Sequence, residues 1–120
     1  MVIVDTSVWI DHFRSGDDGL ARLLDEGQVL AHSWVIGELT LGGLSETAGR
    51  LLNGLPKATV ARDHELMRSI RSNGLTNTGV GLVDAQLVTS ALLTTDATLW
   101  TRERRLTAVA ERLGIAHLLG

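Results

Sequence analysis

The chain has 120 residues, of which 44% are hydrophobic and 21% charged, and it contains no cysteine. These values predict one folded domain over residues 1–120, and they exclude an intrinsically disordered protein, disulfides, thiolate zinc sites and cysteine nucleophiles. A formal net charge of −3 argues against a general polyanion binder with a basic surface. Because no signal-peptide pattern and no long apolar run occurs, we expect an unprocessed cytoplasmic protein that does not enter a membrane.

Short apolar segments with strand character alternate with longer segments of helical period along the whole chain. The first predicted strand covers residues 2–4, and a helix that carries Trp9 and Phe13 one turn apart follows it. The other predicted strands cover residues 29–31, 58–60, 98–101 and 115–117. The other predicted helices cover residues 20–24, 33–41 with Ser33 as the cap, 46–52, 62–71, 82–93 and 102–113.

The connections between the predicted strands contain helices and no two-residue hairpin turn. This pattern predicts parallel strands joined by right-handed crossovers, with helices on both faces of the sheet. The expected fold is therefore an α/β, three-layer α/β/α sandwich with a central parallel sheet of four to five strands. Ligands of such folds bind at the carboxyl ends of the strands, which is where Asp5 is expected.

Four acidic residues occur where a folded sheet could bring them together. They are Asp5 after the first strand, Glu38 within a helix, Asp84 at the beginning of the longest helix and Glu103 after the fourth strand. The helix dipole favours an acid in a first turn, and this explains Asp5, Asp84 or Glu103 equally well when each is taken alone. Asp84, however, shares its helix face with core residues such as Leu87, so its carboxylate needs a partner.

Basic partners for these acids are missing nearby, because no lysine or arginine lies between residues 23 and 49 or between residues 74 and 100. Mg²⁺ or Mn²⁺ would relieve the repulsion, since both ions take carboxylate oxygens and water as ligands. The predicted chemistry is then metal-assisted phosphodiester hydrolysis with water as the nucleophile. Thr6 and Ser7 could orient a phosphate or a water molecule, although helix capping is their ordinary role.

The acids lie in segments that occur together in a known family. These segments are Val4-Asp5-Thr6-Ser7-Val8-Trp9-Ile10, Gly37-Glu38-Leu39, Val83-Asp84-Ala85 and Leu99-Trp100-Thr101-Arg102-Glu103. In this order and at this spacing they resemble the PIN-domain ribonucleases, specifically the VapC-like toxins of bacterial toxin–antitoxin pairs. The resemblance covers nearly the whole chain.

The resemblance implies a Mg²⁺- or Mn²⁺-dependent endoribonuclease that acts on RNA, usually as a homodimer, and that is inhibited by an antitoxin. The family's first three acids correspond to Asp5, Glu38 and Asp84. The fourth, commonly an aspartate two residues after a threonine, corresponds to Glu103 after Thr101, so this chain departs from the pattern by one methylene. We expect the antitoxin's C-terminal segment to lie in the active-site groove.

Several arginines are candidates for contacts to RNA phosphates. Arg102 and Arg105 lie close to Glu103, and the position of Arg102 next to the predicted site favours a functional role for it. A solvated helix face explains Arg68, Arg71 and Arg112 equally well. Asp11 could support the site from behind or lie on the surface.

The sequence also has features of functions other than a nuclease. A catalytically silent PIN-like binding module that acts through protein contacts would also retain the fold, with Glu103 marking a degraded site. A receiver-like domain with Asp5 as phosphoacceptor is disfavoured because the only lysine, Lys57, lies elsewhere. Gly79-Val80-Gly81 lacks the third glycine of a dinucleotide-binding loop.

Overall fold

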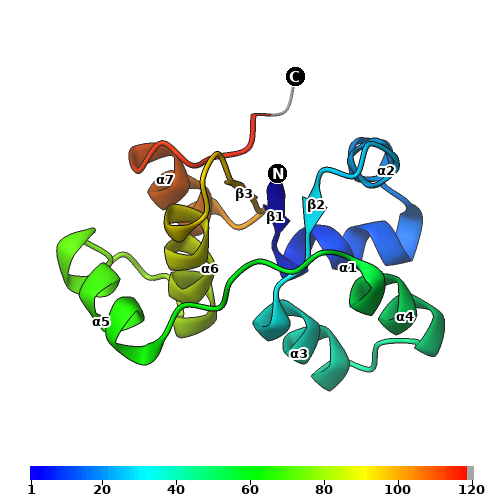
Figure 1. Cartoon of the computed structure of the whole chain (residues 1–120), viewed down its shortest axis with the longest axis horizontal. Coiled ribbons are helices and arrows are strands. Elements are labelled where there is room, and N and C mark those ends of the chain that lie inside the picture. Colours follow the sequence, from blue (N-terminus) through cyan, green and yellow to red (C-terminus); the bar gives the residue numbers. More distant parts are fainter. Residues whose placement is uncertain (119–120) are drawn as a thin grey trace.

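A computed structural model describes residues 1–118, which contain seven helices and a three-stranded parallel sheet (Figure 1). The strands are β1 (Val2–Val4), β2 (Val29–Leu30) and β3 (Thr98–Trp100), in the spatial order β2-β1-β3. The helices are α1 (Thr6–Ser15), α2 (Asp18–Asp25), α3 (Ser33–Leu41), α4 (Glu46–Gly54), α5 (Asp63–Ser72), α6 (Leu82–Leu93) and α7 (Arg104–Arg112). The predicted α/β class with parallel strands is confirmed.

The predicted sheet of four to five strands is larger than the sheet that forms among residues 1–118. The predicted strands at residues 58–60 and 115–117 do not form: the only pairing in the first region is an isolated parallel bridge at the preceding residue, and the second segment contributes one isolated parallel bridge. The bridges pair Ala31 with Lys57 and Leu99 with Ala116. Pro56, which has no N–H to donate, immediately precedes the first bridge and limits its ladder.

The central strand β1 positions the rest of the molecule. Its three residues are all buried, as expected of a strand covered on both faces, and Ile3 is fully enclosed. In the view of Figure 1, α1 to α4 lie on one side of the strands and α5 to α7 on the other. The backbone N–H of Asp5 donates to the carbonyl of Trp100 at 2.9 Å, so the carboxyl ends of β1 and β3 meet at one edge of the sheet.

A buried polar network joins the beginning of α3 to α6. His32, and not Ser33 as predicted, caps α3, because its Nδ1 accepts a hydrogen bond from the N–H of Trp34 at 3.0 Å. His32 Nε2 bonds the Ser90 hydroxyl at 2.9 Å, and that hydroxyl donates to Gln86 Oε1 at 3.1 Å. Burial lowers the pKa of His32 to about 4, so at neutral pH the network holds α6 through an uncharged imidazole.

Helix α6 is the longest of the helices among residues 1–118, with 12 residues. No helix in this part of the chain combines the length and the apolar character needed to cross a bilayer.

Candidate active site

Asp5 lies at the end of β1 and is only 3% exposed. Its Oδ2 accepts hydrogen bonds from the hydroxyls of Ser7 at 2.9 Å and Thr101 at 2.7 Å. Those hydroxyls accept in turn from the backbone N–H groups of Arg102 and Glu103, each at 3.0 Å. The carboxylate is therefore held in one orientation through a single oxygen, and no residue of the described chain donates a hydrogen bond to Oδ1.

Glu38 extends from α3 towards the beginning of α1, and its Oε1 accepts a hydrogen bond from the Thr6 hydroxyl at 2.8 Å. The hydroxyls of Thr6 and Ser7 therefore bind site carboxylates, and neither residue caps α1, whose N-cap is Asp5. The Glu38 side chain is exposed, unlike the buried side chain of Asp5.

Asp84 lies partly buried in the first turn of α6. Burial raises the pKa of its carboxyl to about 6, and the negative charges of Asp5, Glu103 and Glu38 add to this effect, whereas a hydrogen bond from the Gly81 backbone opposes it. The charges of the other three predicted acids therefore act on Asp84 in the folded chain.

These acids line one open cleft of about 520 Å³. Its lining consists of Asp5, Thr6, Ser7, Ile10, Asp11, Glu38, Asp84, Arg102 and Glu103. Every predicted catalytic acid is in this set, together with Thr6 and Ser7. Thr101 does not line the cleft, but its hydroxyl donates a hydrogen bond to Asp5 and so supports the site.

The donor set of this cleft suits a hard divalent cation. It presents carboxylate and hydroxyl oxygens and no histidine, and no cationic side chain lowers the pKa of Asp84. Within residues 1–118, however, no three histidine, aspartate or glutamate side chains converge closely enough to hold an ion as they stand. The acids share a cleft without meeting at one point, so their role as metal ligands stays a prediction.

Arg102 forms ion pairs with two aspartates, and the sequence did not predict these partners. Its Nε lies 2.7 Å from Asp11 Oδ2 and its Nη2 lies 2.5 Å from Asp17 Oδ2, while the guanidinium carbon lies 5.8 Å from the centre of the Trp100 ring. A backbone hydrogen bond from Leu20, together with the Arg102 charge, lowers the pKa of Asp17. The only sequence signal for Asp17 was its position as a helix cap after Gly16.

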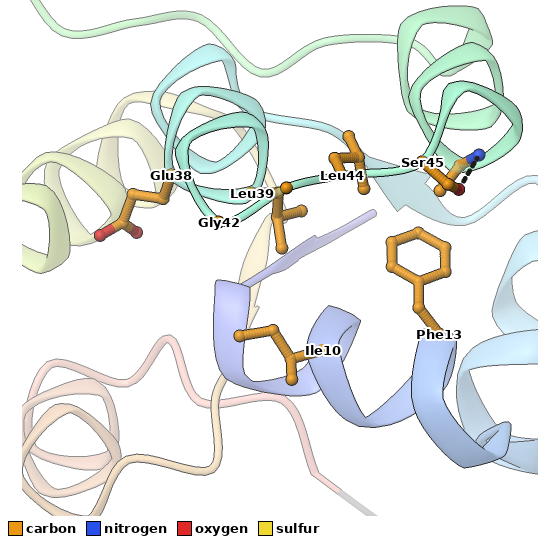
Figure 2. Close-up of a pocket in the computed structure, with 9 residues that line it drawn as sticks. Ile10, Phe13, Glu38, Leu39, Gly42, Leu44 and Ser45 are labelled. Atoms are coloured by element: carbon orange, nitrogen blue, oxygen red, sulfur yellow. Dashed lines mark hydrogen bonds between the residues drawn. The ribbon is translucent and has the colours of Figure 1, made fainter.

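An apolar groove of about 400 Å³ adjoins the acidic cleft and shares Ile10 and Glu38 with it. Figure 2 shows Ile10 and Phe13 on α1 facing Leu39 and Leu44, with Glu38 at one end of the groove. Phe13 stacks on the buried Trp9 ring with centroids 5.4 Å apart. The two depressions therefore form one continuous surface feature that is acidic at one end and apolar at the other.

Comparison with curated proteins finds Ribonuclease VapC32 of Mycobacterium tuberculosis, in strains CDC 1551 / Oshkosh and ATCC 25618 / H37Rv. Each is 39% identical to this chain over 118 residues, which cover 97% of this chain and 95% of the relative. No protein-family model matches the sequence. The similarity thus extends over nearly the full length of both proteins and is not confined to the cleft.

Proposed function

This chain belongs to the VapC family of PIN-domain ribonuclease toxins, and from that premise we propose that its acidic cleft hydrolyses RNA phosphodiester bonds with Mg²⁺ or Mn²⁺. The chain is an endoribonuclease and the toxin of a toxin–antitoxin pair. The observation that carries the proposed metal dependence is that Asp5, Glu38, Asp84 and Glu103 line one cleft, where burial first and then the charges of the other three acids raise the pKa of Asp84.

We assign Asp5, Glu38 and Asp84 to hold the ion, with Glu103 as a fourth position. When bound, the ion would make water a stronger nucleophile and neutralise charge that develops on the phosphate. The bonds from Ser7 and Thr101 to one oxygen of Asp5 leave its other oxygen available to the cleft. Asp84 or Asp5 accepts one proton of the attacking water, whose oxygen bonds to phosphorus while the bond from phosphorus to the 3′-oxygen breaks. The leaving 3′-oxygen takes a proton from solvent and becomes a hydroxyl.

Total RNA incubated with the purified protein should be cut in the presence of Mg²⁺ or Mn²⁺ and remain intact in EDTA. Direct attack by water predicts products with a 5′-phosphate and a 3′-hydroxyl, which mapping of the cut ends measures. Cleavage that persists in EDTA, or ends that carry a 2′,3′-cyclic phosphate, would contradict this mechanism. Intact RNA under every condition would favour the silent binding module instead.

We also propose that the chain forms a homodimer. Large apolar side chains on α5 and α6 are exposed, including Met67 at 45%, Leu82 at 59% and Leu93 at 47%, and a second copy would remove them from water. Sedimentation at micromolar concentration should therefore report a dimer, and a monomer there would contradict the proposal.

The antitoxin partner that this family implies would fit the apolar groove beside the cleft. A segment packed against Ile10 and Phe13 would also cover Glu38, which belongs to both the groove and the cleft. The antitoxin would then inhibit cleavage by excluding RNA from the cleft. An RNA-cleaving toxin with such a partner would act in the cytoplasm.

A further inference from the structure

The Gly79-Val80-Gly81 segment, which does not fit a dinucleotide-binding loop, contacts an arginine side chain of α7. Gly79 has a φ of +84°, and a Cβ placed on it would lie 2.6 Å from Nη1 and 2.7 Å from Cδ of Arg105. The Arg105 side chain therefore lies directly against the Gly79 backbone, where any larger residue would displace it.

This contact joins the two elements that carry Asp84 and Glu103. Arg105 is in the first turn of α7, two residues after Glu103, and Gly79 is in the loop that leads into α6. Both acids line the cleft, and the two residues in contact are two and five positions from them in the chain. Arg105 is not part of the cleft lining and is not among the groups that shift the pKa of Asp84, so it does not serve to neutralise the acids.

Arg102 and Arg105, both predicted to contact phosphates, differ in their partners. Arg102 forms ion pairs with Asp11 and Asp17, which occupy its Nε and Nη2. Arg105 is exposed, and within residues 1–118 it forms neither an ion pair nor a hydrogen bond. A chain with a net charge of −3 and an acidic cleft needs cationic side chains beside that cleft to bind an RNA backbone.

We propose that Arg105, seated on Gly79, binds an RNA phosphate next to the one that is cleaved, whereas Arg102 holds α1 and α2 together. This inference rests on the proposed function and names a residue that binds the substrate. The guanidinium fork suits a phosphate, and a side chain already held against backbone loses less conformational freedom when RNA binds.

The test measures KM and kcat on a labelled RNA that the wild-type protein cleaves, at several salt concentrations. Arg105→Ala should raise KM about tenfold with little change in kcat, as expected for loss of one charge-assisted hydrogen bond. It should also reduce the slope of log KM against log salt by about 0.7, the value for one phosphate contact on a single strand. Gly79→Ala should raise KM in the same direction, and the double variant should be no worse than Arg105→Ala.

Two matched variants control for charge and for backbone strain. Arg104→Ala removes an exposed arginine one residue away and should keep the wild-type KM. Gly74→Ala has the same positive-φ strain, at +63°, but the nearest side-chain atom to its Cβ would be Arg112 Nη1 at an ordinary 3.6 Å, so its KM should also be unchanged.

An unchanged KM in Arg105→Ala, or an equal rise in Arg104→Ala, would overturn the assignment of Arg105 while leaving the ribonuclease function intact. A wild-type protein that cleaves no RNA would overturn the proposed function itself. Because Arg105 is exposed, its replacement tests the inference even if Gly79→Ala fails to fold.

Discussion

Asp5→Asn is expected to lower the rate of RNA cleavage at least about 10³-fold while the chain stays folded. The substitution removes a charge from the centre of the acidic cleft but keeps the volume of a side chain that is only 3% exposed. The amide oxygen of asparagine can still accept the hydrogen bonds from Ser7 and Thr101, so the packing at the end of β1 survives. The measurements are single-turnover cleavage of RNA and thermal unfolding by circular dichroism.

The effects of neighbouring substitutions should follow the contacts of Asp5. Ser7→Ala and Thr101→Ala each remove one donor to Oδ2, and a loss of roughly 10- to 100-fold is expected for a group that orients a metal-binding carboxylate. Asp25→Asn makes the same chemical change at an exposed position on α2 and should leave the rate unchanged. Full activity in Asp5→Asn would remove the basis for hydrolysis at this cleft.

The sequence predicted most of the helices because their signals are local. The segment 82–93 has the bounds of α6, where continuous helical periodicity extends over three turns. The strands at 58–60 and 115–117 were overpredicted, because a short segment of strand-forming residues extends a ladder only when a neighbouring segment pairs with it, and here pairing is limited to one bridge at Lys57 and one at Ala116. Strand propensity does not contain that information.

The acids of the site were predictable because they follow strands or begin helices, where the fold class determines their surroundings. The partners of Arg102 were not, because Asp17 is 85 positions away in the chain and meets it only after the sheet has formed. The contact between Gly79 and Arg105 is hidden for the same reason. The sequence shows the glycine, but it does not show that the Arg105 side chain occupies the space that a Cβ at this position would fill.

Asp84→Asn is expected to stabilise the metal-free chain at pH 7.5 and to abolish its stabilisation by Mn²⁺. The carboxyl has a pKa of about 6 in the folded chain against an ordinary value of 3.8, so folding favours its protonated form. Ionisation of Asp84 therefore destabilises the folded chain. This destabilisation is absent below pH 3.8, increases between pH 3.8 and pH 6 and is constant at higher pH. After allowance for solvent screening, the amide should add about 1–2 kcal/mol, or roughly 3–8 °C in melting temperature.

A second aspartate of the cleft provides the matched control. Asp11 carries the same group but pairs with Arg102 at 2.7 Å, so Asp11→Asn should lower the melting temperature or leave it unchanged. In the wild type, Mn²⁺ at 100 times its dissociation constant should contribute about 2.7 kcal/mol, and Asp84→Asn should lose this contribution. If Asp84→Asn kept the full stabilisation by Mn²⁺ that the wild type shows, the case for a cation held by Asp84 in this cleft would fail.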